Sequence, residues 1–262
     1  MRIAVVAPAC PIERETADRV LALAPDGLSL AFHPQCFLAW GHFAGTDAQR
    51  LSALVDAAND PGFDAVWFAR GGYGSNRIAA NAIGRMDRSA GGKYFVGYSD
   101  AGFLLAGLAA RGIGRPVHAP MPADIRRAGG EAAVLRTLHW LADPALAPTP
   151  RLAFNMVVLS HLLGTPLEPD FSGRELWLEE VDEHHYRIDR TLFHITASAN
   201  VRRAAGIRLG RCLVPENDRP FFGPEGGDTE TIVRHWCRES GIPFLGHADI
   251  GHDTLNAVIP FA

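Results

Sequence analysis

The feature that most limits the fold is a regular alternation of short apolar runs and helical patterns. Apolar runs at 3–7, 28–33, 65–68, 94–98 and 116–119 are each followed by a helical pattern, at 13–24, 46–59, 75–85, 100–111 and 130–142. Such βαβ repetition predicts a parallel sheet, because each crossover helix returns the chain to the same end of the sheet. We therefore expect an α/β protein whose N-terminal, flavodoxin-like sheet has helices on both faces and binds ligands beyond the carboxyl ends of its strands.

The alternation stops at a proline-rich stretch. Residues 142–150 contain three prolines, which is typical of a linker between compact units. Beyond it, the patterns indicate a helix at 157–163, strands at 174–181 and 205–214, one amphipathic helix at 228–240, and short apolar runs at 242–246 and 256–261. We predict a parallel α/β domain at 1–142, a linker at 143–150 and a β-rich mixed C-terminal domain at 151–262.

Composition narrows the kinds of ligand that this chain can have. With 262 residues, of which 47% are hydrophobic and 21% charged, the chain can bury a core without disulfide or metal staples. A net charge of -4 lacks the basic footprint of a nucleic-acid-binding protein. No window approaches the roughly 18 apolar residues of a membrane span, and the apolar run before Pro8 is too short for a signal peptide. We expect a cytoplasmic protein that binds a small molecule or peptide, with neither nucleic acid nor membrane as a partner.

Ser99 lies where an apolar strand ends and a helical pattern begins. A serine in such a tight turn is exposed beside backbone N–H groups and the positive end of the helix dipole, which suits the nucleophile of an acyl transfer. The simpler interpretation is that Ser99 or Asp100 only caps the helix at 100–111.

A glycine loop, Arg70–Gly74, follows the strand at 65–68 and precedes a helix. Its glycines allow close approach of the backbone, so that N–H groups can face an anion. The loop lacks both the P-loop pattern and GxGxxG, so neither a P-loop nor a dinucleotide site is indicated. An oxyanion hole opposite Ser99 and a phosphate site fit equally, and a plain tight turn is the alternative.

Paired carboxylates end the strand at 174–181. Consecutive strand residues point to opposite faces, so only one of Glu179 and Glu180 can face a site. Because Trp177 and Glu179 share a face, Glu179 is the candidate to orient a histidine. The alternative is a solvated strand end, with Asp189 and Arg190 in structural ion pairs.

Two histidines, His247 and His252, each follow a glycine near the end of the sequence. Serine is inert without a base, and imidazole titrates near neutrality, so a histidine here is a candidate general base for Ser99. The spacing is not HExxH and no helical pattern covers the pair, so a zinc hydrolase has little support. Purely structural histidines remain the alternative.

Together these stretches belong to a series of ordered motifs that resembles the LD-carboxypeptidase family of serine peptidases. This family includes muramoyltetrapeptide carboxypeptidases and microcin C immunity peptidases. The matching segments are 41–47 with Arg50, 70–74, 96–100, 118–120, 162–166, 178–183, 186–190 and 251–252. The resemblance implies a triad of Ser99, Glu179 and His252, oxyanion donors from the backbone N–H groups of Asp100 and Gly72, and neither a metal nor an organic cofactor.

The resemblance also implies what the protein does. It indicates a cytoplasmic serine carboxypeptidase that releases D-alanine from a murein-derived tetrapeptide during peptidoglycan recycling, often as a homodimer. The same triad could instead hydrolyse aminoacyl-sulfamoyl adenylates or related acylated amino acids, as in the microcin C group. A non-catalytic α/β module that binds a small anion is the alternative of another class.

Some segments depart from the family pattern. The family's Gly-Gly-Asn-Leu stands here as residues 153–156, its His-Gly-Pro as residues 118–120, and its Ser-Pro-Ser as residues 7–9. The stretch between Ser99 and Glu179 is also shorter than is usual in the family. These segments neighbour the expected site, so they bear on which substrate it accepts.

Overall fold

The computed structural model describes residues 1–145, 149–218 and 227–262. Its first sheet has five parallel strands in the order β2-β1-β3-β4-β5, and a short sixth strand runs antiparallel to β5. The strands are β1 (Arg2–Val6), β2 (Ser29–Phe32), β3 (Ala65–Phe68), β4 (Tyr94–Gly97), β5 (Arg115–His118) and β10 (Ile259–Pro260). This is the flavodoxin-like strand order. The predicted α/β class, with a parallel first sheet, is confirmed.

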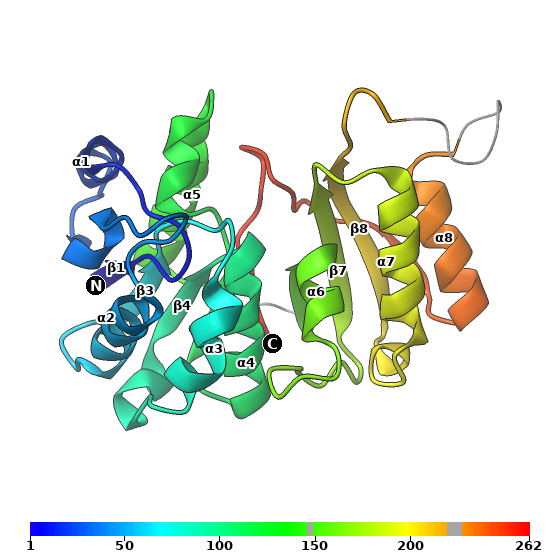
Figure 1. Cartoon of the computed structure of the whole chain (residues 1–262), viewed down its shortest axis with the longest axis horizontal. Helices are drawn as coiled ribbons and strands as arrows, with labels where there is room; N and C mark the ends of the chain where they lie inside the picture. Colours follow the sequence, from blue (N-terminus) through cyan, green and yellow to red (C-terminus); the bar gives the residue numbers. More distant parts are fainter. Residues whose placement is uncertain (146–148, 219–226) are drawn as a thin grey trace.

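Helices cover both faces of this sheet (Figure 1). They are α1 (Arg14–Ala22), α2 (Asp47–Asn59), α3 (Ser75–Ile83), α4 (Gly102–Arg111) and α5 (Gly130–Ala142). Val66 and Phe68 pack into one cluster with α2, α3 and α4, whereas Trp67 packs into another with α1 and α5. A strand buried on both faces must be apolar throughout, which is why the short runs in the sequence indicated these strands correctly.

A second sheet follows, with all of its neighbouring strands parallel. Its order is β6 (Arg151–Asn155), β7 (Glu175–Val181), β8 (Gly206–Leu213) and β9 (Phe244–His247). Helices α6 (Met156–Leu162), α7 (His185–Ala197) and α8 (Thr229–Ser240) accompany it. Helix α6 contacts α4, so one continuous apolar core joins the helices of the first sheet to the second sheet (Figure 1). Residues 146–148 of the predicted linker lie outside the described residues.

Helix α7 was not predicted. Its start is rich in histidine, acidic and basic residues, which we interpreted as the solvated end of a strand. The apolar positions Ile188, Leu192 and Ile195 carry the helical spacing and are buried. Within the described part of the chain Asp189 forms no ion pair, and its carboxylate accepts a 2.9 Å hydrogen bond from the indole of Trp236.

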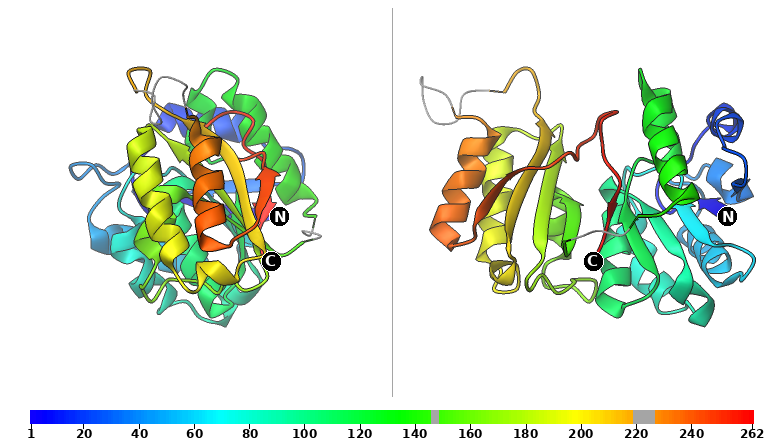
Figure 2. Two further views of the ribbon diagram at one scale, coloured as in Figure 1. Left: turned by 90° about the vertical axis from the view of Figure 1, so that its right-hand side faces the viewer. Right: turned by 180° about the vertical axis from the view of Figure 1, so that it is seen from behind.

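The last part of the chain returns from the second sheet to the first. After β9 it runs through residues 248–258 to β10, where Ile259 pairs with His118 of β5. Figure 2 shows this red segment between the two sheets. It carries His252 to the loops at the carboxyl ends of the first sheet. No helix among the described residues combines the length and the hydropathy needed to cross a membrane.

Candidate active site

Ser99 adopts a backbone conformation that residues other than glycine rarely take. It follows β4 with a φ of 59°, in the left-handed region, and begins the single turn that leads into α4. This conformation costs a non-glycine residue about 1–2 kcal/mol, and such strain concentrates at functional sites. The sharp turn leaves the Ser99 side chain at the wall of a pocket, as a nucleophile requires.

A chain of hydrogen bonds joins three residues that are far apart in the sequence. The Ser99 Oγ lies 2.9 Å from Nε2 of His252, and the Nδ1 of the same ring lies 2.5 Å from Oε2 of Glu179. Ser99 follows β4, Glu179 lies on β7, and His252 belongs to the C-terminal segment. The order of hydroxyl, imidazole and carboxylate is the geometry that activates a serine nucleophile.

Burial strengthens this arrangement. Glu179 is fully buried and His252 is 8% exposed. The interpretation of Glu179 as part of a solvated strand end is therefore wrong. A buried carboxylate that is hydrogen-bonded to Nδ1 fixes the orientation of the imidazole ring.

Gly210 on β8 lets the C-terminal segment approach β7. A Cβ at this position would lie 2.8 Å from the carbonyl oxygen of Ile250 and 3.0 Å from Cβ of Glu179. The segment is also held by Asn256, whose Oδ1 accepts a hydrogen bond from the Gly251 N–H and lies 3.0 Å from Nε2 of His118. These contacts determine where His252 stands relative to Glu179.

Glu180 faces away from the triad. Its carboxylate accepts hydrogen bonds from the side-chain amide of Asn155 and the backbone N–H groups of Val157 and Val181, at 2.5, 3.0 and 2.9 Å. Burial raises the pKa of Glu180 to about 7. The two neighbouring carboxylates therefore serve opposite faces of β7, one toward the histidine and the other toward the start of α6.

Asp100 ties the serine turn to the glycine loop. Its carboxylate accepts hydrogen bonds from the backbone N–H groups of Gly74, at 3.3 Å, and Ser75, at 2.8 Å. Burial raises the pKa of Asp100. The Asp100 side chain thus caps α3, whereas no side chain caps α4, so the interpretation of Ser99 or Asp100 as a cap of the helix at 100–111 is wrong.

The glycine loop packs directly against the serine. A Cβ on Gly71 would lie 3.1 Å from both Cβ and Oγ of Ser99, so a side chain here would push against the hydroxyl. Gly72 has a φ of 108°, which favours glycine, and a Cβ on it would collide with the thiol of Cys10. Among the described residues, none accepts a hydrogen bond from the Gly72 N–H. That N–H is therefore available to a ligand.

Two further groups support the site, although the sequence did not indicate their roles. The buried guanidinium of Arg50 donates to the carbonyl oxygens of Pro8 and Gly74, which joins the loops after β1 and β3. The Tyr98 hydroxyl donates a 2.8 Å hydrogen bond to Asp124, and the Tyr98 ring centroid lies 4.9 Å from that of His252. Arg50 stood in a recognised motif, but Asp124 had no signal in the sequence.

The Ser99 side chain lies at the wall of a pocket of about 630 Å³. Ser99, His252 and both glycines of the 71–72 pair line it, together with three arginines, Arg70, Arg126 and Arg127. Among the residues that the structure describes, Asp124 is the one acidic side chain in this lining, so the described lining has an excess of positive charge. It suits a ligand that carries a carboxylate.

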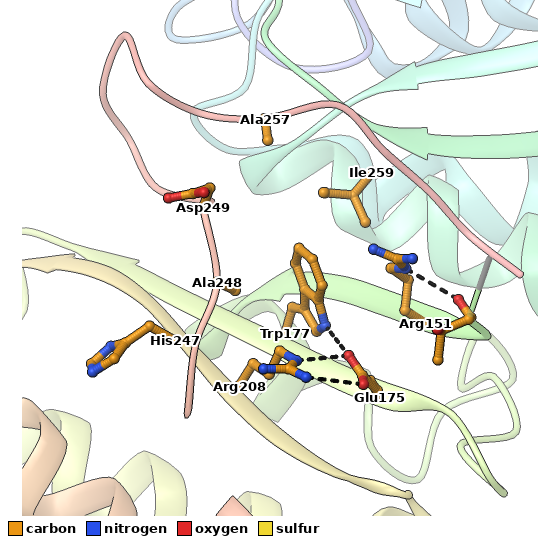
Figure 3. Close-up of a pocket in the computed structure, with 10 residues that line it drawn as sticks. Arg151, Glu175, Trp177, Arg208, His247, Ala248, Asp249, Ala257 and Ile259 are labelled. Carbon is orange, nitrogen blue, oxygen red and sulfur yellow. Dashed lines mark hydrogen bonds and ion pairs between the residues drawn. The ribbon is translucent and has the colours of Figure 1, made fainter. Parts of the chain in front are cut away.

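His247 lines a different pocket. That pocket, of about 450 Å³, lies against the second sheet and the C-terminal segment (Figure 3). Glu175 accepts hydrogen bonds there from Trp177 and Arg208. His247 and His252 thus do not share a site, and no group of three His, Cys, Asp or Glu side chains within the described ranges is arranged to hold a metal ion.

Comparisons with known sequences cover both sheets. The family model for the LD-carboxypeptidase N-terminal domain matches residues 3–119, and that for the C-terminal domain matches residues 152–262. A relative from Synechocystis sp. is 32% identical over 237 residues, which cover 84% of this chain and 75% of the relative. The murein tetrapeptide carboxypeptidase of Pseudomonas aeruginosa is 27% identical, over 99% of this chain and 91% of that protein.

Solved structures show the same fold. Muramoyltetrapeptide carboxypeptidase from Oxalobacter formigenes has a TM-score of 0.81 at 23% identity, over 98% of this chain and 92% of that chain. The microcin C7 self-immunity protein MccF, in complex with aspartyl sulfamoyl adenosine, has a TM-score of 0.80 at 15% identity, over 100% of this chain and 91% of that chain. From the family models and the relatives of similar length, we conclude that this chain belongs to the LD-carboxypeptidase family.

Proposed function

We propose that this protein is a serine carboxypeptidase that releases D-alanine from a murein tetrapeptide, with Ser99, Glu179 and His252 as its catalytic triad. The observation that carries the proposal is the continuous hydrogen-bonded chain from the Ser99 hydroxyl through His252 to the buried Glu179. The strained turn at Ser99 and the open N–H of Gly72 support it independently.

The geometry assigns a task to each member of the triad. His252 takes the proton of Ser99 as the hydroxyl oxygen attacks the scissile carbonyl, and then gives a proton to the leaving nitrogen. Glu179 holds the imidazole in the tautomer that presents an unprotonated Nε2 to the serine, and it stabilises the charged ring. Water then attacks the acyl-enzyme by the same route and restores the free Ser99 hydroxyl.

The oxyanion needs donors on the other side of the reacting carbon. We assign this task to the backbone N–H groups of Asp100 and Gly72. Asp100 follows the nucleophile directly, and Gly72 stands in the loop whose neighbouring glycine packs against Ser99. The bond between the Asp100 carboxylate and the N-terminus of α3 holds the two segments together, so the donors are fixed before substrate binds.

The substrate proposal rests on the relatives and on the charge of the pocket. The Pseudomonas relative that aligns over nearly the whole chain is named a murein tetrapeptide carboxypeptidase. A tetrapeptide that ends in D-alanine carries a free carboxylate next to the bond that is cut, and three arginines line the pocket. The bond would be the one between the L-centre of the diamino acid and D-alanine.

The test is release of D-alanine from L-Ala-γ-D-Glu-meso-diaminopimelate-D-Ala, followed by mass spectrometry with EDTA present. Wild type should release D-alanine and Ser99→Ala should not. Equal release by both proteins would contradict the role of Ser99. Release by neither, from folded protein, would contradict the murein substrate, and an aminoacyl-sulfamoyl adenylate would then be the next substrate to test.

We also propose that the protein is cytoplasmic and that it forms a homodimer. The location follows from the sequence patterns described above, and the homodimer from the family resemblance. Light scattering of the purified protein tests the homodimer, with a mass of twice 28.3 kDa as the expected result.

A further inference from the structure

The terminal carboxylate of a tetrapeptide needs a cationic partner in the pocket, because removing a carboxylate from water without one is costly. Three arginines line the pocket. Arg70 belongs to the glycine loop, whereas Arg126 and Arg127 follow β5 at the end of the short turn Pro122–Arg126. Their positions relative to the triad distinguish them.

The direction of the reaction decides on which side the carboxylate lies. The leaving nitrogen receives its proton from Nε2 of His252, so it must lie beside that ring. In the leaving amino acid, the carboxylate carbon is only two bonds away from this nitrogen. The cation that binds the carboxylate must therefore lie on the same side of the pocket as His252. Arg70 instead belongs to the glycine loop, next in sequence to the proposed oxyanion donor segment, and one of its Nη atoms donates to the carbonyl oxygen of Pro11 at 3.4 Å.

Arg127 stands on the side of His252. Its Nε lies 3.2 Å from Oδ1 of Asp124, and its Nη2 lies 3.5 Å from the hydroxyl of Tyr98. The Tyr98 ring is the one that packs on His252, with 4.9 Å between the centroids. One edge of the guanidinium is thus positioned by two buried groups, of which Tyr98 packs on the imidazole.

The other side of this guanidinium is open to the pocket. The Arg127 side chain is 39% exposed, and Nη1 has no hydrogen-bond partner within the described part of the chain. A planar guanidinium that is held through Nε and Nη2 can still present Nη1 and the outer edge of Nη2 to a carboxylate. Arg126, its neighbour in sequence, is exposed and has no such anchoring among the described residues.

We propose that Arg127 binds the terminal carboxylate of the substrate and so selects peptides that end in a free acid at the scissile residue. This inference rests on the proposed carboxypeptidase function and adds the residue that makes the enzyme a carboxypeptidase. Asp124 and Tyr98 are its positioning residues. They fix the guanidinium beside His252, where the leaving amino acid is protonated.

The experiment compares the tetrapeptide with its C-terminal carboxamide, in wild type, Arg127→Ala, Arg127→Lys and the control Arg88→Ala, an exposed arginine outside the lining of this pocket. Truncation of a charge-paired group typically lowers kcat/KM roughly 30- to 1,000-fold. Relative to wild type acting on the acid, we expect such a loss for wild type acting on the amide and for Arg127→Ala acting on the acid. Arg127→Ala acting on the amide should show little further loss, because the same interaction is already missing. Arg127→Lys should recover part of the activity, and Arg88→Ala should stay within about threefold of wild type.

Equal losses on acid and amide in Arg127→Ala would overturn the proposal, because they would show a merely structural role. A second measurement needs no turnover. In wild type, the tetrapeptide acid should slow the labelling of Ser99 by a fluorophosphonate, and the tetrapeptide amide should not. Without peptide, Arg127→Ala should be labelled at the wild-type rate. With the tetrapeptide acid present, labelling of Arg127→Ala should not slow. If wild type releases no D-alanine, the proposed function fails. Separately, if the tetrapeptide acid still slows the labelling of Ser99 in Arg127→Ala, the proposed role of Arg127 fails.

Discussion

The carboxylate of Asp100 accepts a 2.8 Å hydrogen bond from the backbone N–H of Ser75, 25 residues earlier in the chain. This contact connects the turn that carries Ser99 to the first turn of α3. The residue after Ser99 therefore fixes the position of the glycine loop, and its own N–H is one of the two proposed oxyanion donors.

We expect Asp100→Asn to destabilise the protein by about 1–3 kcal/mol, because an amide offers one acceptor oxygen where the N–H groups of Gly74 and Ser75 use two. One buried N–H is then left unpaired. Urea unfolding measures the loss. An unfolding free energy equal to that of wild type would show that the loop does not depend on this carboxylate.

Gly71→Ala should reduce kcat while the fold persists. The new Cβ would lie 3.1 Å from Oγ of Ser99 and would displace the hydroxyl from His252. A shift of about 1 Å at a reacting group can lower the rate roughly 100-fold. Gly91→Ala is the matched control, since a Cβ at Gly91 meets nothing within 4 Å. Full activity in Gly71→Ala would mean that Ser99 does not need this close contact.

Much of the first half of the fold could be predicted because its strands are covered on both faces. Their apolar runs and the helices between them leave a clear alternation, and the loops at the strand ends then mark Ser99 and the glycine loop. Helix α7 was missed because its polar first turn, from His185 onward, obscured the apolar spacing at Ile188 and Leu192. Charged residues at a strand end and at a helix start look alike in sequence.

The rest of the site depends on contacts between distant parts of the chain. Strand alternation separates Glu179 from Glu180, but only the packing of the C-terminal segment over Gly210 brings His252 to Glu179. Likewise, no spacing in the sequence relates Arg127 to His252, because Tyr98 and Asp124 connect them through tertiary contacts. Local patterns thus singled out Ser99, whereas the groups around it could be identified only from the structure.

Glu179→Gln should lower kcat by about 10³- to 10⁴-fold, because the amide no longer selects the productive tautomer of His252. Glu180→Gln is the matched neighbour. It points toward Asn155 and Val157, so we expect it to retain activity within about tenfold. Steady-state kinetics of D-alanine release compares them. Similar losses in both variants would contradict the assignment of Glu179.

Glu180 should make stability depend on pH. Burial raises its pKa from 4.5 to about 7, so between these values the folded protein holds a proton that the unfolded chain releases. Its contribution to stability is therefore lost as pH rises through this window, by up to about 1.4 kcal/mol per pH unit.

Urea unfolding of wild type and Glu180→Gln at pH 5 and pH 8 isolates this effect. The variant should gain stability relative to wild type at the higher pH, by roughly 2–3 kcal/mol. Any pH-independent change in unfolding free energy that the new amide causes is the same at both pH values, so it cancels when the two differences are compared. A difference that does not change with pH would show that the Glu180 carboxyl titrates normally.

The most direct test of the account is to label the protein with a fluorophosphonate and to identify the modified residue by peptide mapping. We predict one adduct, on Ser99, which forms at least about 100-fold more slowly in His252→Ala, because the serine then lacks its base. Labelling at another residue, or labelling of Ser99 at an unchanged rate without His252, would contradict the proposed triad.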